Sequence, residues 1–391
     1  MRHLVHKKQK SILLITEWAD PRFHHGVALY AKEAGWHLTL DYIYSHILPW
    51  GWRGDGCIAM AGRPDIMKFI RSLKIPVVDV THQQKCAHLP RIHEDDQAIG
   101  ALAADYFLRL GFKNFAWYST DSFDVSTVRH NSFVARLKEA DYTSVPLLWD
   151  PKNSKGPGGW AQRKKWLTRE LKKLPRPTAV FCIDDRMAIN IIDACMDGGI
   201  SIPNEISVLG VGNLNIACEC SGVPLSSIRI DFESFGYQAA SMLDKILNRK
   251  PIHPAPVLLS PLGIEERRST YTLAVSDPAG QKALRFMLDH FTSPINIDDI
   301  AKAGGITRRQ LTYIIHKELN EGPAQLLESI RIKKAFQLLK DSNYTVERVA
   351  YETGLGNALR LQRIFRKLYK TSPGRWRKMN QFEDAPIEPH Q

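Results

Sequence analysis

The stretch GLGNALRLQRIFRKL (354–368) repeats, with substitutions, a pattern that the chain also contains as GITRRQLTYIIHKEL (305–319). In both copies a glycine and an aliphatic residue precede a basic segment whose apolar residues recur at helical spacing. Ile300-Ala301 before the first glycine corresponds to Val349-Ala350 before the second. A short helix, a glycine turn and a basic amphipathic helix form a helix-turn-helix, so the sequence predicts this motif twice.

Each basic helix is expected to bury an apolar stripe and to expose the residues between its members. The expected stripes are Leu311, Ile314 and Ile315 in the first copy and Leu361, Ile364 and Phe365 in the second. The expected outer residues are Arg308, Arg309, Thr312, Tyr313, His316 and Lys317 in the first copy, and Ala358, Leu359, Gln362, Arg363 and Arg366 in the second. These outer residues, Ala358 excepted, are the candidate DNA-binding residues.

A third helix is predicted between the copies, since Pro323 suits the first helical position and an apolar pattern continues to about residue 340. About eighteen residues at 1.5 Å each form a rod of roughly 27 Å. One turn of B-DNA is about 34 Å long, so two recognition helices joined by this rod could enter successive major grooves. The predicted segments are a first motif at about 297–319, a linking helix at about 323–340 and a second motif at about 345–369.

The positive charge of the chain is concentrated in the same region. The whole chain has 53 Lys and Arg against 41 Asp and Glu, a net charge of +12. Residues 277–380 alone contain 19 Lys and Arg against 10 Asp and Glu. Such a local excess indicates a nucleic-acid partner.

The longer N-terminal part alternates apolar runs with amphipathic segments. The runs that predict buried parallel strands are 11–16, 56–61, 76–80, 114–119, 178–183 and 206–211, and helices are expected at 23–34, 98–110 and 186–197. This alternation predicts an α/β fold with a doubly wound parallel sheet. Such a sheet binds its ligand outside the carboxyl ends of its strands.

Other classes of function find little support. The six cysteines form no paired framework and no metal-binding spacing, and no apolar run reaches the length of a membrane helix. No set of Ser, His and Asp and no phosphate-binding glycine loop supports catalysis. We therefore expect a cytoplasmic, nucleoid-associated protein that is not an enzyme and needs no cofactor or metal.

The second copy extends into AYETGLGNALRLQRIFRKLYKTSPGRWR (350–377), which resembles the signature of the AraC-family DNA-binding domain. The resemblance implies that Arg309 and Thr312 face base edges, with Tyr313 beside them, whereas Arg308, His316 and Lys317 meet phosphates. Alkyl-transfer repair enzymes also carry such a domain, but they need a reactive cysteine, and residues 273–391 contain none.

The second copy departs from the family pattern. Leu359 and Arg360 replace a small polar and an aromatic residue. We therefore expect the second copy to use contact with a thymine methyl group and backbone anchoring by Arg363 and Arg366 in place of hydrogen bonds to bases.

The stretch PTAVFCIDDRMAINIIDACMDGGISIPNEISVLGVGN (177–213) resembles the effector domain of LacI/GalR-type repressors and periplasmic sugar-binding proteins. HEDDQAIGALAADYFLRLGFKNFAWYS (93–119) is similar to the same family's dimer-side helix and strand. The resemblance implies a two-lobed effector domain at 1–272, closed by ERRST (266–270), and a DNA-binding domain at 273–391. Asp277 and Pro278 are expected to begin the first helix of that second domain.

The resemblance also implies ligand-binding residues: Trp18, Asp95, Arg129, Asp184 and Asn213. Arg129 matches an arginine that grips sugar hydroxyls, or it is a surface arginine at the start of a helix. Asp95 is a ligand contact or a helix cap, Trp18 stacks on the sugar or packs at a strand end, and Asp185 is expected to cap a helix. Gly212 stands where the family has an aspartate that accepts from two sugar hydroxyls, and Asp184 is the hypothesised replacement.

The order of the two domains resembles bacterial sugar-responsive regulators and implies a sequence-specific transcriptional regulator of carbohydrate catabolism. Activation is favoured, with a xylose-like pentose as the effector and double-stranded DNA, RNA polymerase and a second copy of the chain as partners. A non-sugar effector or repression remains the alternative, because Gly212 removes a carboxylate from the expected site.

Overall fold

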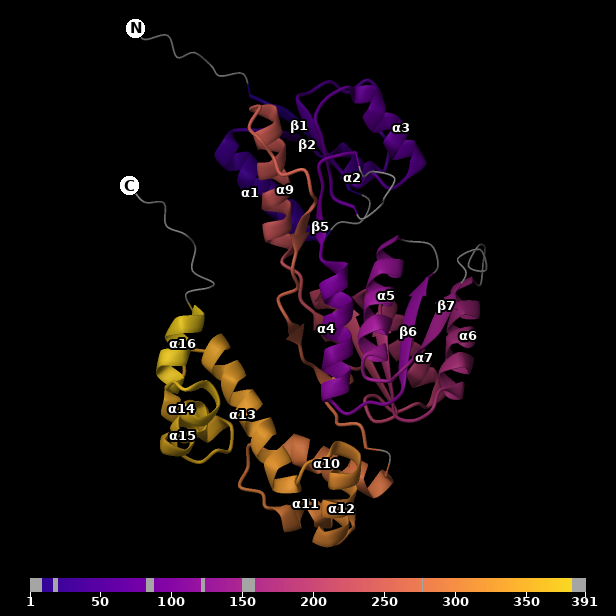
Figure 1. The fold of residues 1–391 in the computed structure, drawn as a ribbon. Coiled ribbons are helices and arrows are strands. Elements are labelled where there is room, and N and C mark those ends of the chain that lie inside the picture. Colours follow the sequence, from indigo (N-terminus) through magenta and orange to yellow (C-terminus); the bar gives the residue numbers. More distant parts are fainter. Residues whose placement is uncertain are drawn as a thin grey trace. The chain divides into compact units, whose positions relative to one another are not determined.

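The computed structural model describes residues 9–16, 20–81, 88–120, 124–149, 159–275 and 277–381. The chain divides into two compact units (Figure 1). The first contains the residues up to Arg109 and Lys113–Thr270, and the second contains Leu110–Phe112 and the residues from Tyr271 onward. The hydroxyl of Tyr271 donates to the carbonyl of Leu288 at 2.9 Å, which attaches the start of this segment to the second unit.

The first lobe of the first unit is built on a parallel sheet in the order β2-β1-β3-β4. The strands are, in that order, His37–Thr39, Ser11–Ile15, Gly56–Ala59 and Val77–Asp79. Its helices are α1 (Pro21–Ala34), α2 (Asp41–Ser45), α3 (Pro64–Leu73) and α9 (Phe232–Leu247). All four residues of β3 are buried, as expected for a strand covered on both faces.

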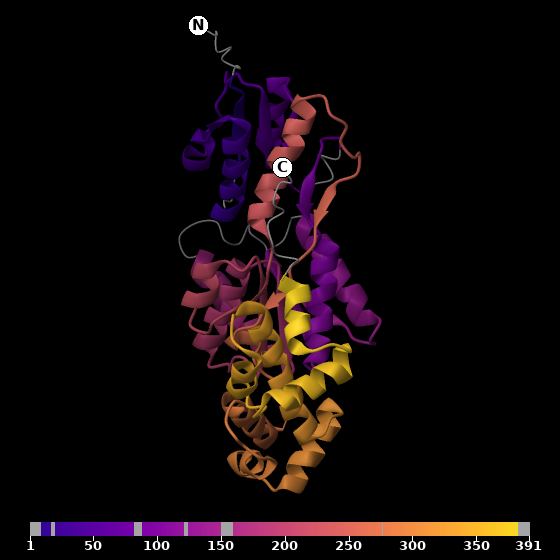
Figure 2. The same cartoon turned by 90° about the vertical axis from the view of Figure 1, so that its left-hand side faces the viewer.

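Helix α9 returns to this lobe about two hundred residues after α1 and lies beside it (Figures 1 and 2). The two helices approach closely through glycines. A Cβ on Gly26 would lie 1.9 Å from the carbonyl oxygen of Glu233, and one on Gly236 would lie 2.0 Å from that of Phe23. Only glycine permits this spacing, so the end of the α/β region completes the lobe that its beginning starts.

The second lobe contains a six-stranded sheet in the order β12-β10-β9-β8-β6-β7, parallel except for the β10–β12 pair. Its strands in chain order are β6 Phe115–Thr120, β7 Ser144–Trp149, β8 Thr178–Cys182, β9 Ile206–Val211, β10 Ser226–Ile228 and β12 Ile264–Glu265. The helices are α4 Asp96–Arg109, α5 Asp124–Lys138, α6 Gly159–Lys173, α7 Asp185–Gly198 and α8 Asn215–Cys220. A short 3-10 helix, η3, spans Arg268–Thr270.

The predicted α/β fold is confirmed, and all six predicted strands form. The additional strands are short, polar or interrupted by proline. Strand β7, for example, contains Pro146 and lies at a sheet edge, where proline is tolerated. Part of the proline-rich segment forms β11 (Val257–Leu259), which pairs in parallel with β5 (Ile92–Glu94) as a separate two-stranded sheet.

From residue 277 to 381 the described elements are all helices. They are α10 Pro278–His290, α11 Ile297–Gly304, α12 Arg308–Leu319, α13 Pro323–Asp341, α14 Val346–Glu352, α15 Ala358–Tyr369 and α16 Pro373–Gln381. The carboxylate of Asp277 accepts from the N–H of Gly280 at 2.8 Å and so caps α10, with Pro278 at the first helical position. No helix among the described residues is long and apolar enough to cross a bilayer.

Candidate DNA-reading surface and effector site

Helix α12 has its orientation set by a capping box and by an apolar stripe. The Thr307 hydroxyl accepts from the N–H of Gln310 at 3.2 Å, and the Gln310 side chain accepts from the N–H of Thr307 at 2.8 Å. Leu311 and Ile315 are fully buried and Ile314 is half-buried in a core shared with α10, α11 and α13. The predicted stripe therefore faces inward, and the basic face points to solvent.

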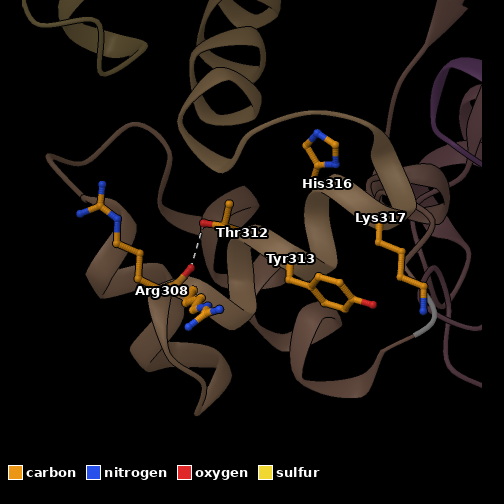
Figure 3. Close-up of a pocket in the computed structure, with 6 residues that line it drawn as sticks. Arg308, Thr312, Tyr313, His316 and Lys317 are labelled. Carbon is orange, nitrogen blue, oxygen red and sulfur yellow. Dashed lines mark hydrogen bonds between the residues drawn. The ribbon is translucent and has the colours of Figure 1, made fainter.

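All six candidate residues of the first copy line one open depression of about 720 Å³ (Figure 3): Arg308, Arg309, Thr312, Tyr313, His316 and Lys317. All six are exposed. The Thr312 hydroxyl donates to the Arg308 carbonyl at 2.9 Å, and the Lys317 ammonium lies 5.8 Å from the centroid of the Tyr313 ring. The depression combines positive charge with hydrogen-bonding groups, which is the chemistry that a nucleic-acid surface requires.

Helix α15 carries a less polar outer face. The Asn357 side chain caps it by accepting from the N–H of Arg360 at 2.9 Å, while Leu361 and Phe365 are fully buried. Leu359 is 65% exposed, so an apolar side chain lies on the outer face at this position. Among the other predicted outer residues, Arg363 and Arg366 are exposed, whereas Ala358 and Gln362 are half-buried.

The turn of the second motif packs against the loop between α10 and α11, just before the first motif. A Cβ on Gly354 would lie 2.4 Å from the carbonyl oxygen of Phe291 and 2.9 Å from that of Thr292. Arg331 of α13, only 7% exposed, donates from Nε to the Phe291 carbonyl at 2.7 Å and from Nη2 to the Ser293 carbonyl at 2.8 Å. We call this contact of Gly354 and Arg331 with residues 291–293 the seam. It joins the second motif and the linking helix to the loop that leads into the first motif.

A second contact of the second motif, with the linking helix, is electrostatic. Arg360 at the start of α15 pairs with Glu328 of α13 at 2.8 Å. Beside this pair and Arg331 lies a pocket of about 240 Å³, which Asn296 and Arg308 of the first motif also line. Because both members of the Arg360–Glu328 pair are well exposed, the pair contributes little stability compared with the buried seam.

In the α/β unit, Arg129 forms a buried ion pair with Asp96. It is 4% exposed, and its Nε donates to Asp96 Oδ1 at 2.7 Å. Nη2 donates to the same carboxylate and Nη1 donates to the carbonyl of Ile183, so the guanidinium joins α4, α5 and the end of β8. Sequence reasoning did not single out Asp96, and its only signal was the Asp95-Asp96 doublet.

The neighbouring carboxylates act as helix caps. Asp95 accepts from the N–H of Ala98 at 2.9 Å at the start of α4. Asp184 caps α7 by accepting from the N–H of Met187 at 2.8 Å, and it also pairs with Arg186 at 2.7 Å. The expectation that Asp185 would be the cap is therefore wrong by one residue, because Asp184 has the extended backbone of a cap and Asp185 is already helical.

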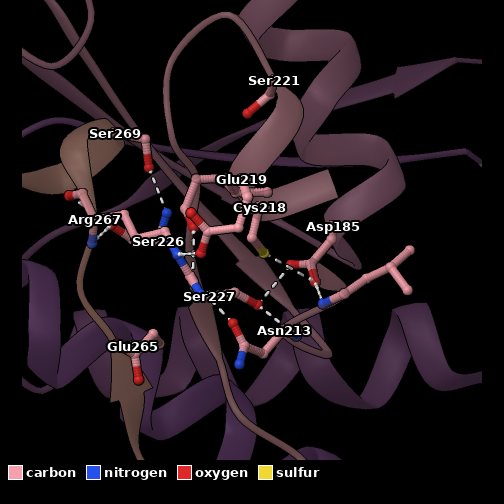
Figure 4. A network of polar contacts seen from close by, with 12 residues as sticks. Asp185, Asn213, Cys218, Glu219, Ser221, Ser226, Ser227, Glu265, Arg267 and Ser269 are labelled. Atoms are coloured by element: carbon pink, nitrogen blue, oxygen red, sulfur yellow. Dashed lines mark hydrogen bonds and ion pairs between the residues drawn. The ribbon is translucent and has the colours of Figure 1, made fainter. Parts of the chain in front are cut away.

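Asp185 instead anchors a buried polar network (Figure 4). Its carboxylate accepts from the Ser227 hydroxyl at 2.6 Å and from the N–H of Leu214 at 2.7 Å. Burial raises the pKa of Asp185 above its ordinary value. The side-chain oxygen of Asn213 accepts from Arg267 Nη1 at 2.9 Å, so Asn213 is held within the same part of the lobe.

Arg22, which sequence reasoning did not select, lies where the two lobes meet. Its Nη2 donates to the carbonyl of Gly212 at 2.8 Å, and its guanidinium carbon lies 5.0 Å from the centroid of the Phe232 ring. Arg22 begins α1 just after β1, and Gly212 follows β9 directly. The contact therefore joins the carboxyl ends of strands from both sheets. Trp18, the candidate stacking residue, lies outside the described residues.

Known proteins resemble both units in this order. Residues 104–270 match the periplasmic binding protein-like domain, and residues 300–379 match a helix-turn-helix domain. The xylose operon regulatory protein of Escherichia coli (strain K12) is 26% identical over 364 residues, covering 91% of this chain and 92% of that protein. The chain is a transcription regulator that combines a periplasmic-binding-protein-like domain with a helix-turn-helix domain.

Two further comparisons extend over most of the regulator. The xylose operon regulatory protein of Haemophilus influenzae is 24% identical over 333 residues, covering 83% of this chain and 84% of that protein. The solved structure of the xylose-binding transcription activator xylR is 25% identical with a TM-score of 0.62, covering 96% of this chain and 99% of that one. The expectation of a DNA-binding regulator with a periplasmic-binding-protein-like effector domain, and not an enzyme, is confirmed.

Proposed function

We propose that the regulator activates genes of carbohydrate catabolism in response to a small sugar, with a xylose-like pentose favoured. The observation that carries the proposal is the similarity to xylose operon regulatory proteins, which spans both units in one order and over nearly the full length. A regulator of this kind acts in the cytoplasm, on the nucleoid.

The DNA-contacting residues are proposed from the faces of α12 and α15. Arg309 and Thr312 contact base edges, Tyr313 lies beside them, and Arg308, His316 and Lys317 bind phosphates. In the second motif Leu359 contacts a thymine methyl group, and Gln362, Arg363 and Arg366 hold the backbone. The depression lined by all six residues of the first motif supports their joint contact with DNA.

The linking helix supports the binding of two successive grooves. Helix α13 has 19 residues, which correspond to a rod of about 28 Å. This length is compatible with two recognition helices entering major grooves about one turn of DNA apart. A dimer of the chain would then present four recognition helices to an operator, and the activator would contact RNA polymerase from this platform.

The effector is proposed to bind at the carboxyl ends of the strands, near Arg129, Asp95, Asp184 and Asn213. Ligands of doubly wound domains bind at the carboxyl ends of strands such as β8 and β9. Asp95, Asp184 and Asn213 follow β5, β8 and β9, and Arg129 of α5 reaches the carbonyl of Ile183 at the end of β8. Because each of them already has a protein partner, ligand binding must exchange those bonds or use the remaining donors and acceptors. Asp184→Ala tests the role assigned to Asp184, and an unchanged affinity for the effector would remove it from the site.

The alternative within the same class is a non-sugar effector or repression. Gly212 favours it: its φ of 117° disfavours any side chain, so this position cannot supply a carboxylate without backbone change. Thermal-shift screening of the full chain against neutral pentoses and hexoses distinguishes a sugar effector from a non-sugar effector. A ligand that binds only the folded state raises the midpoint of thermal unfolding. A reporter gene with the chain's own promoter then distinguishes activation from repression.

A further inference from the structure

The pocket of about 240 Å³ beside the seam lies within the helical unit and is lined by charged groups of both signs. The described charged residues that line it are Asp298, Arg308, Glu328, Arg331 and Arg360. They belong to α11, α12, α13 and α15, so both helix-turn-helix copies and the linking helix contribute to the pocket. Its volume is several times the roughly 30 Å³ of one water, which leaves room for a ligand group.

The pocket adjoins the depression that carries the candidate DNA-binding residues of α12, because Arg308 lines both. Arg308 is the first residue of α12 and Arg360 is the third residue of α15. The pocket therefore lies where the two proposed recognition helices begin. Two recognition helices in successive major grooves leave a stretch of phosphate backbone facing the protein between them.

The arginines at the two helix starts are held only by exposed carboxylates. Arg360 Nη2 donates to Glu328 Oε1 at 2.8 Å, and Arg308 Nη1 donates to Asp298 Oδ2 at 3.4 Å. Both members of each pair are exposed, and ion pairs of this kind contribute little to folding stability. Arginine binds carboxylate and phosphate with the same fork of donors, so a phosphate can take the place of either carboxylate.

Arg331 adds a positive charge that cannot move away. It is buried, and its hydrogen bonds to the carbonyls of Phe291 and Ser293 hold its guanidinium in place. Burial lowers the pKa of Arg331, and the positive charge of Arg360 lowers it further. An anion in the pocket would reduce this repulsion between the two guanidiniums.

We propose that this pocket binds a phosphate of the DNA backbone between the two major-groove sites, and that Glu328 occupies Arg360 until DNA replaces it. Arg360 is then a DNA-binding residue that sequence reasoning did not select, and Glu328 acts against DNA binding. The inference rests on the proposed DNA-contacting faces of α12 and α15 and adds a contact between them. Because the contact is with the backbone, it does not depend on base sequence.

Two substitutions by glutamine distinguish this role from a structural one. If the ion pair served only to hold α15 against α13, Arg360→Gln and Glu328→Gln would both weaken DNA binding. The proposed site predicts opposite signs. Arg360→Gln should weaken binding about tenfold, as expected for the loss of one charge-assisted bond, whereas Glu328→Gln should tighten it about threefold because the competing carboxylate is gone.

Fluorescence anisotropy of the full chain with a random-sequence duplex of about three helical turns, roughly 30 base pairs, measures both effects. No operator is needed, since a backbone contact forms on any sequence. Arg360→Gln should also reduce the slope of log affinity against log salt by about one unit. Glu352→Gln is the matched control for Glu328→Gln: each glutamate is 42% exposed and pairs with an arginine of the same unit, but Glu352 does not line the pocket.

The inference is overturned if Glu328→Gln weakens DNA binding or leaves it unchanged, or if Glu352→Gln tightens it as much. It is also overturned if Arg360→Gln changes neither the affinity nor the salt slope. None of these outcomes bears on the proposed sugar response, which effector screening tests separately. The proposed DNA-contacting face of α12 has its own test in Lys317→Ala, so its failure is distinguishable from the failure of the pocket.

Discussion

The two helix-turn-helix copies have the same turn glycine in two different environments. Gly305 (φ 70°) and Gly354 (φ 67°) both adopt the left-handed conformation. A Cβ on Gly305 would meet no atom within 4 Å, whereas one on Gly354 would collide with the carbonyls of Phe291 and Thr292. The first turn is therefore a local structure, and the second is also part of the seam with residues 291–293.

The recognition helices differ in their exposed faces, and here the first copy has the more polar face. Copy one presents Arg309 on an exposed polar face, while copy two presents Leu359 at the corresponding position. Copy two also uses Arg360 to reach Glu328 on the linking helix, where copy one uses Gln310 to close a capping box. We propose from this comparison that the first copy specifies the sequence and that the second fixes the position of the pair.

The largest difference is expected between two alanine substitutions. Gly305→Ala should cost about 1–2 kcal/mol, because the strain is limited to the left-handed backbone. Gly354→Ala should cost about 2–5 kcal/mol, because overpacking against two carbonyls adds to that strain. Urea denaturation of both variants measures the difference. Equal losses would show that the second turn does not depend on the seam.

Substituting Arg331, the other member of the seam, should weaken the coupling between the two helix-turn-helix copies. Arg331→Ala leaves the carbonyls of Phe291 and Ser293 without their donor and should cost about 2–4 kcal/mol of folding free energy. Affinity for a two-groove operator should fall more than affinity for a half-site, measured by fluorescence anisotropy. Arg348→Ala removes an exposed arginine that pairs with Glu352 and lies 4.1 Å from the centroid of the Tyr344 ring, and it serves as the control, with about 1 kcal/mol or less expected.

Specificity should be lost from the first copy and much less from the second. Arg309→Ala should weaken cognate DNA by about 1–3 kcal/mol while affecting random DNA far less, because a base-edge contact is lost. Leu359→Ala should reduce discrimination by well under this amount. Competition binding with cognate and random duplexes provides the measurement. A larger loss for the leucine variant would reverse the assignment of roles.

The smallest effect should be the same in both copies. Lys317→Ala and Lys367→Ala each remove one exposed cation at corresponding positions of the two helices. Each should weaken cognate and random DNA about equally, and each should reduce the slope of log affinity against log salt by about one unit. If either substitution alters sequence preference, that lysine contacts a base and not a phosphate.

The helix-turn-helix motifs could be predicted because their determinants are local. Thr307, Asn357 and the two turn glycines mark helix ends, and the apolar stripes recur at fixed spacing. The seam could not be predicted from the sequence, because the hydrogen bonds of Arg331 to carbonyls forty residues earlier form only on tertiary folding. An arginine in the middle of an amphipathic helix gives no sign that it is buried.

The strands of the α/β unit could be predicted where they are apolar and central. Strand β10, with the sequence Ser-Ser-Ile, forms because β9 offers it an open edge, which local sequence does not reveal. The effector site was harder to predict, because its contacts also depend on tertiary structure that local sequence does not reveal. Asp184 and Asp185 are adjacent, and only the backbone conformation decides which one caps α7 and which one is buried. Arg22 was missed because its partner Gly212 lies 190 residues away.

The seam also limits which operators the regulator can use. Each base pair inserted between the two groove sites rotates the second site by about 35° around the duplex axis. A flexible joint would follow this rotation, but a joint built on a buried arginine and a glycine without room for a methyl group cannot. We expect operators of this regulator to tolerate changes of base more readily than changes of helical phase, so that spacing, and not only sequence, identifies its sites in a genome.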